Sequence, residues 1–251
     1  MNLSWGFRRK LLYTSVAAGV LFFVLLVVWR TYFVTVPTCT DGIHNQDERG
    51  IDCGGSCALV CQSDTHAPVV LWARAFQNGS GTYSATAYIR NDNLDAGARS
   101  VRYMFQLFDK DNSLIAERDG VADLPPIEII PLIESNIEVG NRTVEHTLFS
   151  FAEAPVWYTI STSSIPALSV DKQVLEASEP RLSATITNDT ITDASNVSVV
   201  AVLFDSAGVA RASSKSFLKS VPHLSAKDVV FTWPSTIPDI VRAEITVVPS
   251  F

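Results

Sequence analysis

The stretch VRYMFQLFD, residues 101–109, has a counterpart 96 residues later in VSVVAVLFD, residues 197–205. Every second residue of each stretch is apolar, which is the pattern of a β-strand with one face in a core. The predicted inward residues are Val101, Tyr103, Phe105 and Leu107 in the first stretch, and Val197, Val199, Ala201 and Leu203 in the second. A further match, residues 89–92 with residues 186–189, has an offset of 97. Together these matches predict two copies of one β-sandwich-sized unit.

The segments around the first copy also have the pattern of strands joined by turns. Residues 69–77 are predicted to form a strand, and residues 82–90 a returning strand with Tyr83, Ala85, Ala87 and Ile89 on one face; the turn Asn-Gly-Ser-Gly between them predicts a hairpin. Asp109 and Asp205 each begin a turn, and we expect their carboxylates to accept hydrogen bonds from backbone amides rather than act as catalytic acids. No sustained helical period follows residue 66, so we expect the rest of the chain to be all β.

The first copy is longer than the second, and the extra residues lie around LPPIEIIPLI, residues 124–133. The prolines make this segment stiff and exclude it from a central strand. We interpret it as an apolar loop, which either binds a partner or folds over the core of the sandwich. The candidate binding residues are Pro125, Pro126, Ile127, Ile129 and Ile130.

Near the N-terminus, residues 11–29 read LLYTSVAAGVLFFVLLVVW and contain no charged residue. A helix of this length spans about 29 Å, which matches the hydrocarbon core of a bilayer. From Leu11 to Trp29 we therefore expect a single transmembrane helix in contact with lipid. Arg8, Arg9 and Lys10 precede it, so the N-terminus should be cytoplasmic and the bulk of the chain extracytoplasmic. A cleaved signal peptide is the alternative, but no small-x-small cleavage site follows the apolar run.

These features divide the chain into five parts. We predict a cytoplasmic tail (1–10), a transmembrane helix (11–30), a disulfide-rich segment (31–65) and two β-sandwich domains (66–164 and 165–251). Four of the 19 Lys and Arg residues flank the helix, which leaves 15 against 26 acidic residues in the remainder. This acidic balance argues against nucleic acid as a partner.

All four cysteines, Cys39, Cys53, Cys57 and Cys61, lie in the segment that follows the helix. In an exported chain the expected outcome is two local disulfides, with three possible connectivities. Zinc is a weaker alternative, because the first cysteine stands alone rather than in a closely spaced pair.

Acidic and amide side chains with many glycines lie between the first two cysteines. The oxygen-bearing residues are Asp41, Asn45, Asp47, Glu48 and Asp52. Such a loop is a candidate calcium site, although its spacing is not that of an EF-hand. The alternative is that these side chains stabilise turns by accepting hydrogen bonds from backbone amides.

Two resemblances follow from these motifs. The pattern from Cys39 to Cys57, with Asp52-Cys53-Gly54-Gly55 near its end, resembles the DCGG-type disulfide segments of exported microbial proteins. The strand ends Leu107-Phe108-Asp109 and Leu203-Phe204-Asp205 are similar to those of FxLYD-like, immunoglobulin-type (Ig-like) domains of bacterial envelope proteins. The combination resembles uncharacterised membrane-anchored surface proteins of bacteria, and implies tandem Ig-like β-sandwiches outside the cell.

No catalytic arrangement stands out among the four histidines, and no nucleophile elbow or phosphate-binding glycine loop is present. We therefore expect a non-enzymatic cell-surface protein with a structural or protein-binding role in the envelope and with an unknown envelope protein as partner. The alternatives are an accessory subunit of a secretion or pilus-type complex, and a hydrolase whose site is assembled only in three dimensions.

Overall fold

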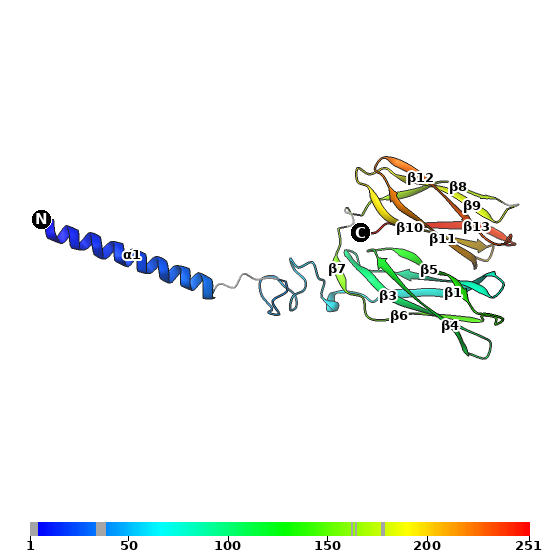
Figure 1. The fold of residues 1–251 in the computed structure, drawn as a ribbon, viewed down its shortest axis with the longest axis horizontal. Helices are drawn as coiled ribbons and strands as arrows, with labels where there is room; N and C mark the ends of the chain where they lie inside the picture. Colours follow the sequence, from blue (N-terminus) through cyan, green and yellow to red (C-terminus); the bar gives the residue numbers. More distant parts are fainter. Residues whose placement is uncertain (1–4, 34–38, 162, 164, 177–178) are drawn as a thin grey trace. The chain divides into compact units, whose positions relative to one another are not determined.

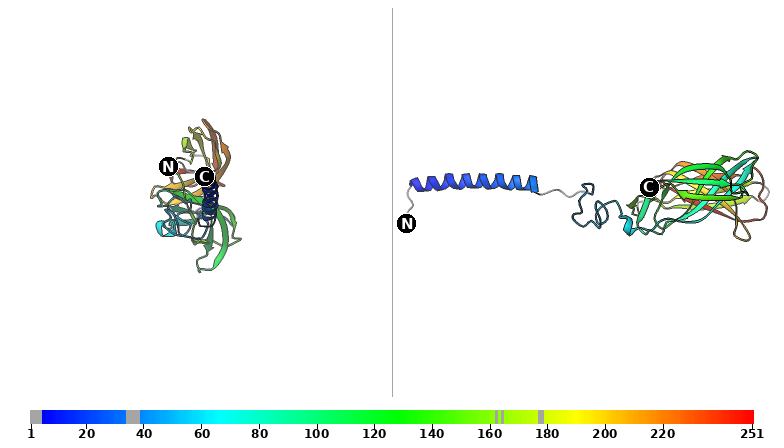
Figure 2. Two further views of the ribbon diagram at one scale, coloured as in Figure 1. Left: turned by 90° about the vertical axis from the view of Figure 1, so that its left-hand side faces the viewer. Right: turned by 90° about the horizontal axis from the view of Figure 1, so that it is seen from below.

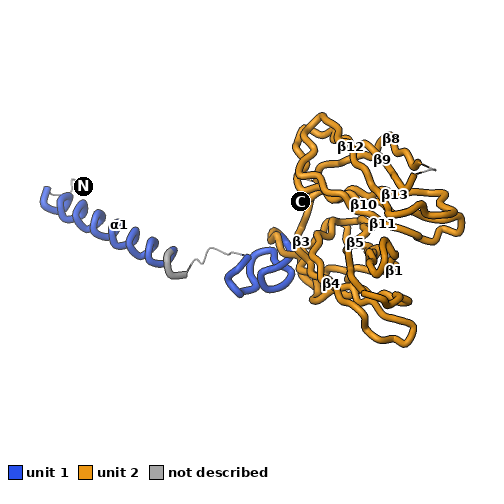
Figure 3. The backbone as a smooth tube through the Cα atoms, turned by 45° about the vertical axis from the view of Figure 1, so that its right-hand side comes forward, with its two compact units in different colours: residues 1–55 blue, residues 56–251 orange. Residues whose placement is uncertain are grey.

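The computed structural model describes residues 5–33, 39–161, 163, 165–176 and 179–251. Residues 1–4 of the predicted tail, 34–38 of the predicted disulfide-rich segment, and residue 164 at the predicted domain boundary lie outside this description. The chain forms two compact units, residues 1–55 and residues 56–251 (Figure 3). Each unit is described by itself.

The first unit begins with helix α1, Trp5–Phe33. Residues 5–30 are long and apolar enough to cross a membrane, and no part of their most apolar window is buried. The helix therefore starts before Leu11 and includes residues 5–10 of the predicted tail. Residues 39–55 consist of turns, with an isolated bridge between Gly50 and Cys53.

The second unit is mainly β and begins with a short 3-10 helix, Gln62–Asp64. Its first β-sandwich has one sheet of order β1-β2-β5 and a facing sheet of order β4-β3-β6, in which β7 also pairs with β3 (Figure 1). The strands are β1 Val69–Gly79, β2 Thr82–Arg90, β3 Ala96–Phe108, β4 Leu114–Leu124, β5 Ile129–Glu138, β6 His146–Phe151 and β7 Trp157–Thr159.

The second β-sandwich of the same unit has sheets of order β12-β9-β8 and β11-β10-β13. The strands are β8 Leu168–Glu176, β9 Arg181–Asn188, β10 Ala194–Asp205, β11 Ala210–Val221, β12 Ser225–Thr232 and β13 Ile240–Val248. All pairings are antiparallel, and the strands of both sandwiches run along one common direction (Figures 1 and 2).

The alternating residues of β3 and β10 point into two separate cores, as the sequence predicts. Val101, Tyr103, Phe105 and Leu107 are buried in the core of the first sandwich. Val197, Val199, Ala201 and Leu203 are buried in the core of the second. The alternating residues of β2, from Tyr83 to Ile89, also belong to the first core.

Two asparagines explain why the residues around them recur in the sequence. The Asn91 amide donates hydrogen bonds to the carbonyls of Ala96 and Pro125, and the Asn188 amide donates to those of Thr192 and Val221. Each side-chain oxygen also accepts the backbone N–H two residues further on. Both asparagines are buried. Through these hydrogen bonds each one links two separate segments of its sandwich, at corresponding positions in the two sandwiches.

The aspartates at the strand ends accept the same pair of backbone hydrogen bonds, and Asp205 also pairs with Arg211. Asp109 accepts the N–H groups of Asp111 and Ser113, and Asp205 accepts those of Ala207 and Val209. The predicted role as turn-formers is confirmed. Each turn contains a residue with a positive φ, Asn112 or Gly208, as the bulged hairpin requires.

A third apolar cluster joins the two sandwiches. The outer face of the β1-β2-β5 sheet packs on the outer face of the β11-β10-β13 sheet, with Tyr88, Ile133, Val202 and Phe204 buried between them. Tyr88 stacks on Trp72 and meets the edge of Phe204. We call this contact the seam. It fixes the two sandwiches as one body of four sheet layers.

Candidate functional site

The predicted calcium residues lie in the first unit, and their carboxylates accept backbone hydrogen bonds. Asp52 accepts the N–H groups of Asp41 and Gly42 at 2.9 Å. Glu48, which is buried, accepts those of Asn45 and Asp52 at 3.2 and 3.4 Å. These contacts are those of turn-formers, the alternative that the sequence leaves open.

The side-chain oxygens of the same loop are already engaged in hydrogen bonds or lie apart. Asp41 accepts the N–H of Ile43 and the amide of Asn45, so both of its oxygens are engaged. Within residues 39–55, no three carboxylates bring an oxygen each within 4.8 Å of the others. Calcium binding by Asp41, Asn45, Asp47, Glu48 and Asp52 stays a prediction, and a bound ion would have to replace several backbone contacts.

All four cysteines are disulfide-bonded, so no free thiol is present. This agrees with the prediction of two bridges. It disfavours the zinc alternative, because zinc ligation requires thiolates.

The predicted apolar binding loop is only partly a loop. Pro125 and Pro126 are buried and Ile130 is 2% exposed, whereas Ile127 and Ile129 are exposed. From Ile129 onward the chain forms β5, an edge strand that contains Pro131 where no neighbour requires its N–H. The expectation of a loop is therefore wrong for residues 129–133, although their exclusion from a central strand is confirmed.

Ile127 has a φ of 51°, which is unfavourable for a β-branched residue. Its N–H donates to the carbonyl of Asn93, and the carbonyl of Glu128 accepts the N–H of Asn91. Backbone hydrogen bonds to Asn91 and Asn93 thus hold this short loop in a strained form, with the Ile127 side chain in solvent.

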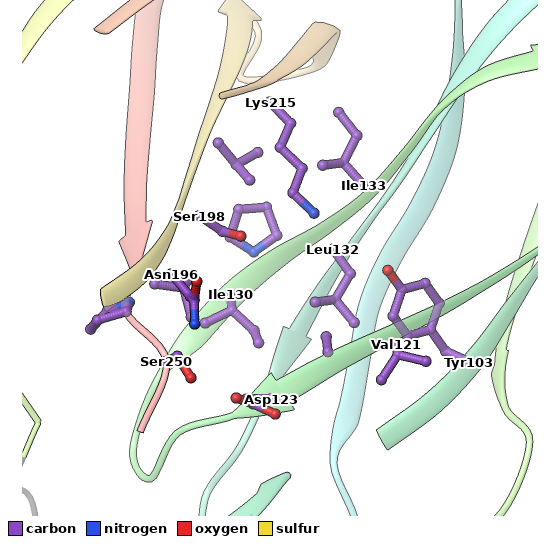
Figure 4. A pocket seen from close by; sticks show the side chains of 15 residues that line it. Tyr103, Val121, Asp123, Ile130, Leu132, Ile133, Asn196, Ser198, Lys215 and Ser250 are labelled. Atoms are coloured by element: carbon purple, nitrogen blue, oxygen red, sulfur yellow. The ribbon is translucent and has the colours of Figure 1, made fainter. Parts of the chain in front are cut away.

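A cavity of about 220 Å³ opens where the seam ends (Figure 4). We call it the apolar pocket. Its floor comes from β5, from Ile130 to Ile133, and its other walls come from β3, β4, β10, β11 and the chain end near Ser250. Lys215 and Tyr103 are both directed into this hollow (Figure 4).

Tyr103 links the first core to the apolar pocket. Its ring is buried and touches Phe105 edge-on and Phe149 face-on. Its hydroxyl donates to Glu134 at 3.0 Å, and Glu134 lies 3.6 Å from Arg118. Burial, with the negative charge and the hydrogen bond of Glu134, raises the pKa of Tyr103 well above its usual range. The hydroxyl is therefore a neutral donor at any physiological pH.

A second cavity, of about 420 Å³, lies along the seam, and Lys215 borders both cavities. We call it the polar pocket. Short hydroxyl and amide side chains dominate its walls, and its one ionisable wall residue among those that the structure describes is Lys215. Trp233 and Pro234 supply its apolar surface. The Lys215 side chain makes no hydrogen bond or ion pair with any residue in the described part of the chain, so its charge is available to a ligand.

Among the residues that line these pockets, Ile130 belongs to the binding residues predicted from the sequence. The others come from strands far apart in the sequence, and each looks ordinary on its own strand. One signal was available for the seam: residues 199–204 of β10 are six consecutive apolar residues, which indicates burial on both faces.

An exposed pair of a histidine and an aspartate lies outside both pockets. The Nδ1 atom of His223 is 2.7 Å from the carboxylate of Asp193, and both side chains are about 60% exposed. The backbone and side-chain hydrogen bonds from His223 lower the pKa of Asp193. The pair closes a turn at the end of β11, and neither residue borders the apolar or the polar pocket.

Neither a family model nor a curated protein matches the sequence. Among solved structures, the crystal structure of red sea bream transglutaminase aligns with 74% of this chain and 29% of its own, at 14% identity and a TM-score of 0.24. A likeness this weak carries no argument about fold or activity.

Proposed function

We propose that this chain is a non-enzymatic, membrane-anchored protein that presents two Ig-like β-sandwiches outside the cell as one rigid binding body. The observation that carries the proposal is helix α1. Its apolar side chains have no protein core to enter among the described residues, so lipid is the environment that accommodates them.

The arrangement of the second unit supports the binding role. Two flexibly linked sandwiches would leave Tyr88, Val202 and Phe204 exposed, whereas the seam buries all three. Burying each of them stabilises the seam by about 1.5–3 kcal/mol. Rigid scaffolds lower the entropy cost of binding, and the two pockets lie along this fixed contact.

Disulfides in the segment after the helix support export. Two bridges persist in an oxidising compartment and are rare in the cytosol. The basic residues before the helix and the acidic excess after it favour the same orientation.

The alternative is an accessory subunit of a secretion or pilus-type envelope complex. One feature favours it: Leu94 is 71% exposed and Ile127 56% exposed on two adjoining loops. Exposed aliphatic side chains on a constrained loop suit a protein partner. Cross-linking in native membranes followed by mass spectrometry separates the two roles, because a complex subunit yields one neighbour at high occupancy, whereas a protein that binds its ligands reversibly yields no single dominant neighbour.

Protease accessibility tests the topology. A tag at the C-terminus should be lost when protease is added to spheroplasts, while a tag at the N-terminus should survive until the membrane is permeabilised. Survival of the C-terminal tag on intact spheroplasts would refute export. A cytoplasmic protein serves as the control for membrane integrity.

A further inference from the structure

Several buried hydroxyl side chains lie at the wall of the polar pocket, where apolar side chains would pack equally well. Ser84, Thr86 and Ser213 are all at most 5% exposed, and Thr86 and Ser213 are hydrogen-bonded at 2.7 Å across the seam. Ser84 and Ser213 also line the pocket. Burying hydroxyls costs free energy unless they are paired, so their concentration here defines a built polar wall rather than a gap in the core.

Asn78 adds an unsatisfied group to this wall. Its amide nitrogen donates to the Ser84 hydroxyl at 2.8 Å. Its carbonyl oxygen is buried and accepts no hydrogen bond from any residue that the structure describes. A buried acceptor without a donor costs about 1–3 kcal/mol. This oxygen has no exposed surface, so a ligand would bond it only after the Asn78 side chain moves.

The remaining walls determine which ligand fits. Asn136 is exposed and has a φ of 58°, at an irregularity in the pairing of β5 with β2. Trp233 donates its ring N–H to the carbonyl of Ser213 at 3.2 Å, so its ring is held in one orientation. No acidic side chain lines the pocket among the described residues, and Lys215 provides one positive charge at the end shared with the apolar pocket.

We propose that the polar pocket binds a saccharide, with Lys215 placed for a ring hydroxyl or an acidic substituent. Neutral hydroxyl and amide walls complement a ligand whose edges are hydroxyl groups. A peptide would instead need a row of apolar pockets for alternate side chains. The cavity of about 420 Å³ lies within the usual size range of small-ligand sites.

This inference deepens the proposed binding role, and it can be tested on the purified full-length chain in neutral phosphatidylcholine nanodiscs. Isothermal titration calorimetry with chitotetraose, maltotetraose and tetragalacturonate should show saturable binding of at least one of them. The double variant Asn136→Gly/Lys215→Met should weaken that binding by about tenfold, because it removes an amide and a cation from the wall.

A matched control variant is available for each substitution. Asn112→Gly replaces another exposed asparagine with a positive φ, and Lys219→Met replaces an exposed lysine on the same strand outside both pockets. Both controls should bind as the wild type does. A preference for tetragalacturonate that disappears in Lys215→Met would support an acidic saccharide, and equal binding of the neutral sugars would support a neutral one.

Two results would overturn the inference: no heat with any of the three saccharides at millimolar concentration, or binding that the pocket variant and the controls change equally. Because the assay uses purified protein, its outcome is independent of topology. Export without saccharide binding would remove this inference alone, and saccharide binding by a chain that is not exported would remove only the proposed location.

Discussion

Gly120 on β4 lies directly opposite Tyr103 on β3, and the tyrosine ring crosses the backbone at this glycine. A Cβ atom at position 120 would overlap the ring carbons and hydroxyl of Tyr103. The ring cannot withdraw freely, because it is buried against Phe105 and Phe149 and its hydroxyl is bound to Glu134. We therefore expect Gly120→Ala to destabilise the first sandwich.

The size of the effect follows from three contributions. Overpacking a filled core costs about 1–3 kcal/mol. Displacing the ring also weakens a hydrogen bond to a charged acceptor, worth about 1.5–3 kcal/mol when intact. Replacing a strand glycine with alanine recovers about 0.5–1 kcal/mol. A net loss of about 2 kcal/mol lowers the melting temperature of a unit of this size by about 4–8 °C.

Thermal unfolding of the full-length chain in detergent, followed by near-UV circular dichroism, measures this shift. Gly79→Ala is the matched control, because Gly79 also lies in a strand and an added Cβ would meet only Thr82 at an ordinary 3.6 Å. The control should be neutral or slightly stabilising.

A double-mutant cycle tests whether the tyrosine ring is the cause. In a Tyr103→Leu background the obstructing ring is absent, so adding Gly120→Ala should cost little, and the coupling free energy should be about 2 kcal/mol. The reasoning is refuted if Gly120→Ala leaves the melting temperature unchanged. It is also refuted if the full loss persists in the Tyr103→Leu background.

Three further predictions concern the cores and the acidic loop. Phe105→Ala should lower the free energy of unfolding by about 3–5 kcal/mol, whereas Leu148→Ala, at a 56% exposed site, should lower it by less than about 0.5 kcal/mol; equal effects in urea titrations would contradict the assignment of Phe105 to the core. Burial raises the pKa of Tyr88 and Tyr103, so above about pH 10 the unfolded state loses protons that the folded state keeps. Stability should therefore fall as the pH rises, by about 1.4 kcal/mol per pH unit for each tyrosine, and Tyr103→Phe should halve that slope in pH-dependent urea titrations; an unchanged slope would exclude Tyr103 as a source. Calcium titration of the full-length chain should give no saturable heat, because the Asp52 carboxylate is occupied by backbone N–H groups, and saturable binding that is lost in Asp52→Asn would reverse this view.

The parts of the fold that depend on local pattern were predictable from sequence. Phe105 and Ala201 face their cores because alternation along a strand determines which face a side chain occupies. Asp109 and Asp205 form turns because a carboxylate can accept the N–H groups two and four residues further on, which involves no distant segment. Local chemistry thus accounts for the strands, their ends and the hairpin turns.

The pockets were not predictable, because they depend on which outer sheet faces meet. Lys215 borders two cavities only because β11 lies beside β5 of the other sandwich, and no spacing in the sequence relates these two edge strands. Ser135 and Thr232 look like ordinary solvent-facing strand residues until the seam brings them to one wall. A site assembled from five strands has no local signature.

The seam was partly predictable from the sequence of β10 and β2. A strand with one face in solvent alternates between apolar and polar residues. Residues 199–204 of β10 are instead apolar without interruption, so Val200 and Val202 need a second buried surface.

The sheet that covers β10 is harder to predict, because the outer face of β2 carries Thr86 and Tyr88, which suit either solvent or a polar contact. In the structure both are buried: Tyr88 contributes its ring to the apolar cluster and its hydroxyl to Glu244, and Thr86 pairs with a serine. A polar residue on a sheet face therefore does not exclude burial there, and the two sandwiches join through a surface that is apolar at one end and hydroxyl-rich at the other. Lys215 borders both the apolar and the polar pocket, which share no other lining residue.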